Sequence, residues 1–278
     1  AARHRVPKFY SDAQSLINDP EVNAIYIATP PAQHEAYALQ AMAAGKPVYI
    51  EKPLSLDAAS ARRIHDAHLQ SGVPATGAYY RRALPLFRKV KLLLAENKIG
   101  KVKLVNVTTC QAVNENIITK TPDNWRVNPS LSGGGYFHDL SPHQLDLMYW
   151  FFGKPVTVHG RSLNQDKQYN APDITTVEAV FPHDVLFRGV WAFNVHRSAV
   201  ADTCEIIGDT GTMKFSFFTG AKLEIKTSEE TDTMEFVNHV NIQFDMIEKV
   251  VSYFRGEGEN PCSMADALVS MEMMDSTV

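Results

Sequence analysis

The chain has 278 residues, a formal net charge of -4 at pH 7, and hydrophobic and charged fractions of 45% and 21%. These values are ordinary for a globular protein, and a slightly acidic chain without a Lys/Arg-rich stretch gives no reason to expect nucleic-acid binding. Three widely spaced cysteines indicate neither a disulfide framework nor a metal site, and no apolar run is long enough to span a membrane. We therefore expect a cytoplasmic protein with one large domain or two ordinary ones.

Helices and strands alternate in the first part of the chain. Short apolar runs bounded by proline or glycine predict strands, and the stretches between them carry helix start and stop signals. The predicted elements are a helix at 12–18, a strand at 24–29, a helix at 33–44, a strand at 47–50, a helix at 56–70 with Asp57 in its first turn, and a strand at 73–79. This order predicts βαβ units, a parallel sheet and right-handed crossovers.

The pattern changes after Arg82. The predicted elements are an amphipathic helix at 84–96, a strand at 102–113, a loop at 121–135, an apolar helix at 141–152, successive strands from 156 to about 235 (175–181, 185–193, 203–207 and 211–217 among them), and helices near 240–254 and 263–276. The turn 208–211 predicts a hairpin. An α/β part (residues 1–79) is therefore expected before an α+β part (residues 80–278) with a mostly antiparallel sheet.

Lys52 follows the predicted strand 47–50, in the run Glu51-Lys52-Pro53. Ligands of parallel α/β sheets bind at the carboxyl ends of the strands, where an ammonium group can donate to a substrate oxygen or a cofactor ribose. The alternative is a solvent-exposed lysine after a strand. Pro53 stiffens the backbone, and the peptide bond before a proline can be cis.

Asp139 and His143 lie four residues apart, after the three glycines 133–135. A capping box at the start of the predicted helix is indicated by Ser141 (N-cap), Pro142 (N1) and Gln144 (N3). The helix N-terminus disfavours a charged imidazole and Asp139 favours it, so His143 can titrate near neutral pH as a general base. The glycines allow close backbone approach to a ligand. Alternatively, His143 only bonds Asp139 at a helix start and the glycines form a flexible turn.

Trp125-Arg126 lies in the loop just before the glycines. An aromatic face for C–H groups beside a fork of N–H donors suits a polyol. The alternative is a tryptophan that anchors its own loop.

Three further places offer candidate site residues. Arg81-Arg82 follows the third predicted strand and either pairs with a phosphate or carboxylate or forms a solvated domain junction. Tyr80 beside it either lines the site or belongs to the core. His34 either faces a cofactor from the end of the first strand or is a helix-start histidine without a ligand.

Together these segments resemble the family of glucose–fructose oxidoreductase and inositol dehydrogenase. The resemblance extends over essentially the whole chain and is carried by 19–30 (DPEVNAIYIATP), 44–53 (AGKPVYIEKP), 79–82 (YYRR), the glycines 133–135, Asp139, His143 and Asp146. It implies an N-terminal Rossmann-type parallel sheet and an α+β domain with a large open sheet that commonly packs against another subunit, hence a homo-oligomer (dimer or tetramer). Members typically move a hydride between NAD or NADP and a sugar or polyol.

The resemblance also implies roles for individual residues. Lys52 contacts the substrate and the nicotinamide ribose, His143 exchanges the proton of the reacting hydroxyl, and Asp139 orients the substrate and tunes His143. The implied cofactor-binding residues are Thr29, Pro30, Pro31, His34, Glu51, Lys52 and Arg81. The implied substrate-binding residues are Tyr80, Trp125, Arg126, Asp139 and His143, with Trp125-Arg126 similar to the substrate loop of the anhydrofructose reductase branch.

Family members begin with a strand, a Gly-rich turn, a helix and a second strand. This chain starts just after that second strand by comparison, so we expect it to be an incomplete record of a longer protein. The residue that distinguishes NAD from NADP would lie in the part before Ala1. Two alternatives to hydride transfer are a non-catalytic sugar-binding or regulatory protein on the same scaffold and an NAD-dependent glycosidase.

Overall fold

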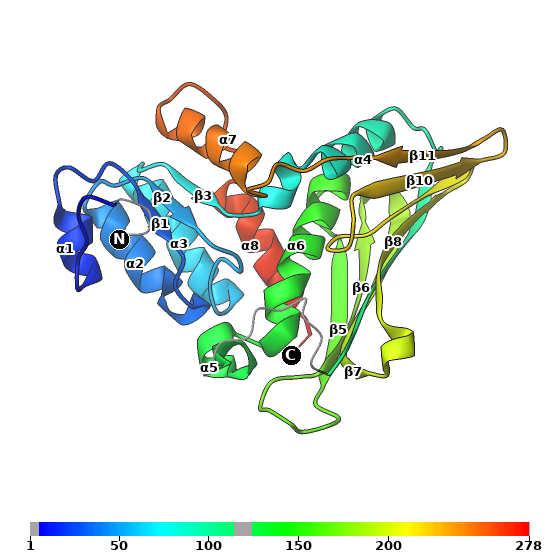
Figure 1. The fold of residues 1–278 in the computed structure, drawn as a ribbon, viewed down its shortest axis with the longest axis horizontal. Helices are drawn as coiled ribbons and strands as arrows, with labels where there is room; N and C mark the ends of the chain where they lie inside the picture. The colour runs from blue at the N-terminus through cyan, green and yellow to red at the C-terminus, as the bar shows by residue number, and fades with distance from the viewer. Residues whose placement is uncertain (1–5, 114–123, 278) are drawn as a thin grey trace.

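The computed structural model describes residues 6–113 and 124–277, and Figure 1 shows its two parts. A small parallel sheet with helices lies on one side, and a large sheet with helices on one of its faces lies on the other. Both parts agree with the predicted fold class. The first five residues of the predicted first domain and the first three of the predicted loop 121–135 lie outside the described residues.

The small sheet has the order β1-β2-β3, and both strand pairs are parallel. Its elements are α1 (Ala13–Asn18), β1 (Ile25–Ile27), η2 (Pro31–Gln33), α2 (His34–Ala43), β2 (Val48–Ile50), α3 (Ala58–Ser71) and β3 (Ala75–Gly77). The predicted alternation is confirmed, although each strand has only three residues. Asp57 is the N-cap of α3 and not part of its first turn, because its carboxylate accepts from the Ser60 N–H at 2.7 Å.

The large sheet has the order β11-β10-β9-β8-β4-β7-β6-β5. Its strands are β4 (Val102–Ala112), β5 (Thr157–Leu163), β6 (Ile174–Phe181), β7 (Val185–Val195), β8 (Ala201–Gly208), β9 (Gly211–Phe215), β10 (Lys222–Thr227) and β11 (Thr231–Glu235). Only β4 and β7 pair in parallel, so the prediction of a mostly antiparallel sheet is confirmed. β8 and β9 form the predicted hairpin at 208–211.

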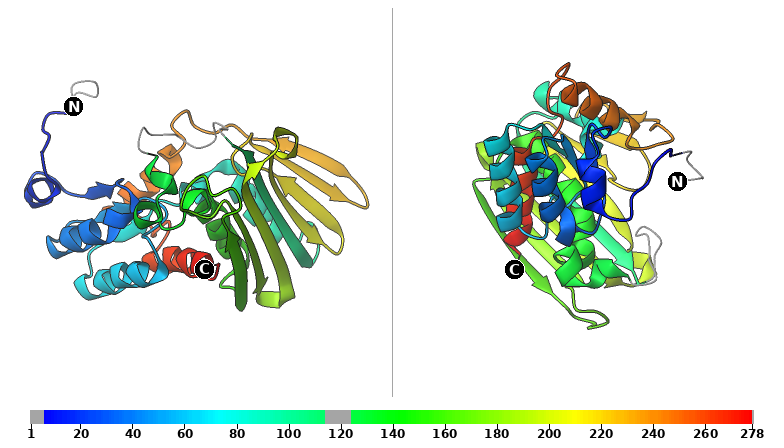
Figure 2. Two further views of the ribbon diagram at one scale, coloured as in Figure 1. Left: turned by 90° about the horizontal axis from the view of Figure 1, so that it is seen from below. Right: turned by 90° about the vertical axis from the view of Figure 1, so that its left-hand side faces the viewer.

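Helices cover one face of this sheet and join the two parts (Figure 2). They and the short 3-10 segments are η3 (Tyr80–Ala83), α4 (Pro85–Ala95), η4 (Trp125–Val127), α5 (Pro129–Ser132), α6 (Gly135–Phe152), η5 (Pro182–Asp184), η6 (Arg197–Ala199), α7 (Phe244–Phe254) and α8 (Met264–Asp275). The last helix, α8, packs against both α3 and α6, so the end of the chain contacts the first part. In the described ranges no helix is long and apolar enough to cross a membrane.

The predicted start of α6 at Ser141 is wrong. The helix begins at Gly135, whose N–H donates to the Ser132 hydroxyl at 3.1 Å, and Pro142 lies inside it. The predicted capping residue Gln144 is instead buried and bonds Thr109 of β4 (2.6 Å) and Trp191 of β7 (2.5 Å). These contacts anchor the helix on the sheet and hold it in place around its internal proline.

Candidate active site

Lys52 and Asp139 form an ion pair where the two parts of the molecule meet. Lys52 follows β2, and its ammonium donates to Asp139 Oδ1 and to the Asp139 main-chain oxygen, both at 2.7 Å. Arg126 Nε donates to Asp139 Oδ2 at 3.2 Å. The Lys52 and Asp139 side chains are 14% and 18% exposed, so the pair is largely desolvated but still reachable.

The charge on Asp139 is maintained by its two cationic neighbours. Burial raises the pKa of this carboxyl group, but Lys52 and Arg126 outweigh burial and hold its pKa below the usual value. Both carboxylate oxygens are therefore occupied by donors from opposite sides. Asp139 can hold the Lys52 ammonium in a fixed direction at neutral pH.

His143 lies one turn further along α6, on the same face as Asp139. Burial, followed by the charges of Lys52 and Arg81, lowers the pKa of His143 well below 6.5. The prediction of titration near neutral pH is therefore wrong, because burial and two nearby cations disfavour the charged imidazole, and the Asp139 carboxylate is bonded to Lys52 and Arg126 instead. Within the described residues, His143 Nδ1 is buried without a hydrogen-bond partner. The ring is neutral at pH 7 and retains proton-accepting capacity.

Aromatic side chains surround this cluster. Tyr80 meets the His143 ring edge-on with 5.2 Å between ring centroids, which places this predicted substrate residue beside the imidazole. Phe218 approaches the same ring from the large sheet, at 6.0 Å. The Arg126 guanidinium lies 4.5 Å from the centre of the Trp125 ring. Sequence reasoning missed Phe218, because the only local signal was its place beside the predicted strand 211–217.

The segments after β1 and β2 carry the predicted cofactor residues. Thr29, Pro30 and Pro31 follow β1, and Glu51 follows β2, where it accepts from Tyr26 and Gln243. The Thr29 hydroxyl is buried and has no hydrogen-bond partner in the part of the chain that the structure describes. An unpaired hydroxyl beside a lysine at the carboxyl edge of a parallel sheet fits a nicotinamide ribose, which offers hydroxyl partners.

His34 does not face outward from this edge. Its side chain is fully buried, with Nε2 2.8 Å from the Thr29 carbonyl oxygen and Nδ1 3.0 Å from the Pro53 carbonyl oxygen. The His34 ring therefore contacts the backbone next to Thr29 and Lys52, in place of the predicted direct contact with a cofactor. The Lys52–Pro53 peptide bond is cis, as the sequence allowed.

Arg81 and Arg82 are both buried, which contradicts the interpretation of a solvated domain junction. Arg81 turns toward the large sheet, where it donates to the Phe217 carbonyl and lies 4.5 Å from the centre of the Phe218 ring. This geometry does not support the predicted direct cofactor contact.

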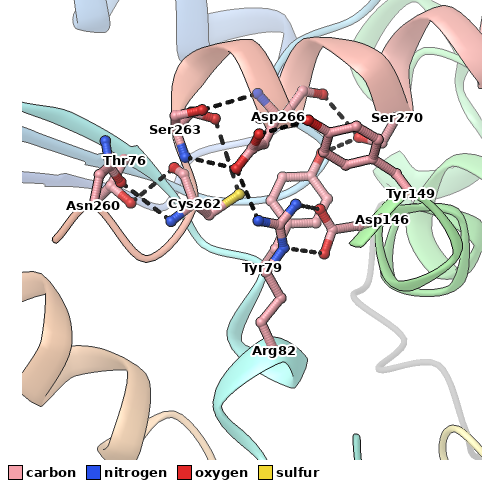
Figure 3. Close-up of polar contacts among 11 residues, drawn as sticks. Thr76, Tyr79, Arg82, Asp146, Tyr149, Asn260, Cys262, Ser263, Asp266 and Ser270 are labelled. Atoms are coloured by element: carbon pink, nitrogen blue, oxygen red, sulfur yellow. Dashed lines mark hydrogen bonds and ion pairs between the residues drawn. The ribbon is translucent and has the colours of Figure 1, made fainter. Parts of the chain in front are cut away.

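Figure 3 shows that Arg82 is at the centre of a hydrogen-bonded cluster, here called the Arg82 network. The network comprises Arg82, Asp146, Tyr149, Ser263 and Asp266. Arg82 binds Asp146 through two bonds of 2.9 and 2.7 Å and Asp266 through a third of 2.9 Å. Burial lowers the pKa of Arg82, but Asp146 and Asp266 more than offset it and raise the pKa well above its usual value.

The glycines 133–135 serve the protein's own packing. A Cβ on Gly134 would lie 2.1 Å from the His138 ring, and one on Gly133 would lie 2.6 Å from the Leu56 carbonyl oxygen. Gly133 also has a φ of +92°, which disfavours other residues. The predicted ligand approach and the predicted flexible turn are thus both replaced by tight contacts with His138 and Leu56. Over the described ranges, no cluster of three or more His, Cys, Asp or Glu residues is arranged to hold a metal.

Two family models match the chain. The oxidoreductase family with an NAD-binding Rossmann fold matches residues 1–79, and the GFO/IDH/MocA C-terminal domain matches residues 87–214. Oxidoreductase P35 of Formosa agariphila is 40% identical over 275 residues, which cover 99% of this chain and 84% of that protein. The chain belongs to the GFO/IDH/MocA family. The resemblance stated from the sequence is confirmed, and the chain is an NAD(P)-dependent oxidoreductase.

Other relatives carry more specific names. Inositol 2-dehydrogenase of Acidothermus cellulolyticus is 32% identical over 157 residues, covering 56% of this chain and 42% of that protein. Levoglucosan dehydrogenase, solved with NADH and levoglucosan, has a TM-score of 0.84 at 21% identity and covers 99% of this chain and 82% of that chain. The aldose-aldose oxidoreductase of Caulobacter crescentus, solved with glycerol, has a TM-score of 0.83 at 20% identity, covering 96% and 79%. At these identities the two structures establish the shared fold.

Proposed function

We propose that this oxidoreductase transfers a hydride between a nicotinamide and the CH–OH carbon of a sugar, polyol or related carbonyl compound. The observation that carries the proposal is the Lys52 ammonium, fixed by Asp139, on the same cluster as the neutral His143. An ammonium donor and a neutral imidazole are the two groups needed to bind a hydroxyl and take its proton.

Each residue has a separate role in this proposal. His143 accepts the proton of the reacting hydroxyl during oxidation and returns it during reduction. Lys52 donates a hydrogen bond to the reacting oxygen, and Asp139 keeps the ammonium directed toward it. A bound nicotinamide supplies or accepts the hydride. The lowered pKa of His143 leaves the imidazole neutral at pH 7, which is the form that accepts a proton, and makes it a weaker base than an exposed histidine.

The cofactor would lie along the carboxyl edge of the small sheet. Thr29, Pro30, Pro31, Glu51 and Lys52 line this edge, and the unpaired Thr29 hydroxyl and the Lys52 ammonium are the groups suited to a ribose. His34 would act indirectly, by holding the carbonyl groups of Thr29 and Pro53. Both NAD and NADP fit these residues.

The substrate would lie between Lys52 and the aromatic residues of the cluster. Tyr80 and Trp125 offer faces to C–H groups, and Arg126 offers N–H donors to hydroxyls. Inositol and levoglucosan dehydrogenases among the relatives support a cyclic polyol or sugar. The face of the large sheet opposite its helices would pack against another copy to form a homo-oligomer (Figure 2).

The test compares His143→Ala with His183→Ala, a control at an exposed histidine of η5. We expect His143→Ala to lower kcat by about 100-fold or more, the usual contribution of a general base, with the Kd for NADH unchanged. Turnover is followed by NADH absorbance with inositol, levoglucosan and glycerol, and the Kd by fluorescence titration. An equal loss of NADH affinity would contradict the proton-transfer role, and wild-type protein that oxidises no polyol and reduces no sugar would contradict hydride transfer.

A further inference from the structure

Residues 216–220, here called the Phe218 loop, join β9 to β10 and reach from the large sheet to His143. The backbone of this loop is hydrogen-bonded to Asp202 of β8, which is 7% exposed. The Asp202 carboxylate accepts from the N–H groups of Phe217 (3.1 Å), Phe218 (2.6 Å) and Thr219 (2.8 Å) and from the Thr219 hydroxyl (3.1 Å). Four bonds to one buried carboxylate fix the backbone of this loop.

Arg81 holds the same loop from the opposite side. Its Nη1 donates to the Phe217 carbonyl, and its guanidinium lies 4.5 Å from the Phe218 ring centre and 5.3 Å from that of Tyr80. Arg81 is only 6% exposed, and in the described part of the chain it forms no ion pair with a carboxylate. A buried guanidinium without an ion pair is costly, and the carbonyl oxygen, the aromatic faces and the nearby charge of Asp202 compensate part of this cost.

Two of the three aromatic rings that the Arg81 guanidinium faces, those of Tyr80 and Phe218, also flank His143. Tyr80 and Phe218 meet the imidazole edge-on at 5.2 and 6.0 Å. His143 itself is 5% exposed, whereas Tyr80 and Phe218 are each partly exposed. The accessible surface next to the imidazole is therefore aromatic on both sides, and on the Phe218 side it comes from a loop with a fixed backbone.

We propose that Phe218 is a specificity-determining residue, which contacts the C–H face of the substrate next to the reacting carbon, and that Arg81 and Asp202 position it. This inference rests on the proposed hydride transfer at His143. A ring compound with several C–H groups on one face fills an aromatic wall, whereas a short open-chain polyol leaves most of it uncovered. Phe218 thus discriminates by shape and apolar contact, and Lys52 and His143 act on either kind of substrate.

The first test compares Phe218→Leu, which keeps an apolar side chain but removes the ring, with Phe244→Leu, a control at a 40% exposed phenylalanine on α7. We expect Phe218→Leu to lower kcat/KM for levoglucosan and inositol by about 3- to 10-fold, the range of a lost aromatic contact, mainly through KM. kcat/KM for glycerol should change by less than about 2-fold, and Phe244→Leu should match wild type. An equal loss for ring and open-chain substrates would overturn the proposal.

The second test addresses positioning with Arg81→Met, Arg81→Lys and Asp202→Asn. Arg81→Met removes the cation, so we expect the same selective rise in KM for ring substrates, whereas Arg81→Lys keeps a cation over the rings and should recover part of it. For Asp202→Asn we expect a rise in KM for ring substrates between those of the two Arg81 variants, because an amide oxygen can still accept hydrogen bonds from the loop. A uniform fall in kcat with weaker NADH binding in all three variants would show a merely structural role and overturn the positioning claim.

Binding measurements separate this inference from the proposed function. If wild-type protein turns over no polyol, hydride transfer on polyols fails, but calorimetric titration of levoglucosan and inositol with the NADH-loaded protein still tests Phe218. Weaker ring binding in Phe218→Leu than in wild type would support the aromatic wall. Equal binding in both, or no binding to wild type, would overturn it.

Discussion

Helix α6 carries two aspartates seven positions apart, of which Asp139 is partly exposed and Asp146 is buried. Asp139 is held by Lys52 and Arg126, which come from separate segments, and the Lys52 and Asp139 side chains are 14% and 18% exposed. Asp146 accepts from Nε and Nη2, which form one edge of the Arg82 guanidinium, and the Arg82 and Asp146 side chains are 5% and 1% exposed. One end of the helix therefore presents an accessible ion pair, and further along it the ion pair is closed to solvent.

The hydrogen-bond partners of Asp139 and Asp146 explain why one ion pair is accessible and the other is not. Arg82 directs donors to Asp146 and Asp266, and Asp266 is bonded further to Tyr149 and Ser263, so the Arg82 network joins α6, η3 and α8 around an Arg82–Asp146 pair that is shielded from solvent (Figure 3). Lys52 has donors beyond those that Asp139 occupies. The same residue type on one helix thus belongs to a closed network at Asp146 and to an accessible ion pair at Asp139, where the proposed function places its chemical role.

The largest expected effect comes from exchanging each aspartate for asparagine. Asp139→Asn should lower kcat/KM by about 100-fold or more, because the Lys52 ammonium loses the charge that directs it. Asp146→Asn should leave most turnover intact per folded molecule but lower the urea midpoint. Steady-state kinetics and urea unfolding of both variants measure the two effects. If Asp139→Asn changed kcat/KM by less than about 3-fold, the contrast between the two ends would be wrong.

Breaking the closed network should cost stability. Arg82→Met leaves Asp146 and Asp266 buried without their cation, and we expect the free energy of unfolding to fall by about 3–5 kcal/mol. Arg88→Met, at an exposed arginine on α4, is the matched control and should change it by less than about 0.5 kcal/mol. The double variant Arg82→Met/Asp146→Leu should recover part of the loss, because no unpaired charge then remains on α6. No recovery would mean that the arginine acts through packing alone.

Local patterns in the sequence predicted the first part of the fold and singled out Lys52 and Asp139 as candidate site residues, whereas the ion pair between them is a finding of the structure. Strands that alternate with helices indicate a parallel sheet, and a lysine after one strand then lies at the edge where ligands bind. Asp139 and His143 were singled out by their spacing, and in the structure that spacing places them on one helix face. These inferences needed only the pattern of residues that are close together in the sequence.

The errors arose where distant residues decide the structure. Pro142 lies inside α6, although a proline at this place in the sequence is typical of a helix start. The hydrogen bonds of Gln144 to Thr109 and Trp191, which anchor the helix, could not be predicted from the sequence. The pKa of His143 was mispredicted because the burial that mainly lowers it depends on long-range packing, and because Lys52 and Arg126 bind the Asp139 carboxylate. Long-range pairing of this kind depends on which charges are brought together in three dimensions, and a single sequence does not contain it.

Acid should destabilise the protein through His138, which precedes Asp139 on α6. Burial lowers the pKa of His138 from 6.5 to about 4. Below pH 6.5 His138 binds a proton in the unfolded chain but stays neutral in the folded chain until the pH approaches 4. The stability of the folded chain with respect to His138 is therefore complete above pH 6.5 and is lost as the pH falls toward 4. The shift corresponds to about 3 kcal/mol for His138. Urea unfolding from pH 7 to pH 4 should show a shallower decline for His138→Phe than for wild type, and parallel curves would contradict this assignment.

The smallest expected effect comes from Ser263→Ala at the start of α8. The Ser263 hydroxyl accepts from the Asp266 N–H at 3.1 Å, and the Asp266 carboxylate accepts from the Ser263 N–H at 3.3 Å. Loss of this cap should cost about 1 kcal/mol of unfolding free energy, and Ser71→Ala, at an exposed serine of α3, should cost less than about half of that.

Double-variant cycles then sharpen the contrast between the two ends of α6. Ser263→Ala and Arg82→Met share Asp266, so their unfolding free energies should be non-additive by about 0.5 kcal/mol or more. Ser263→Ala and Asp139→Asn share no partner and should add within about 0.5 kcal/mol. Coupling between the second pair as large as in the first would mean that the Lys52–Asp139 ion pair and the Arg82 network form one cooperative unit, because α6 would then transmit the loss of a cap on α8 to Asp139.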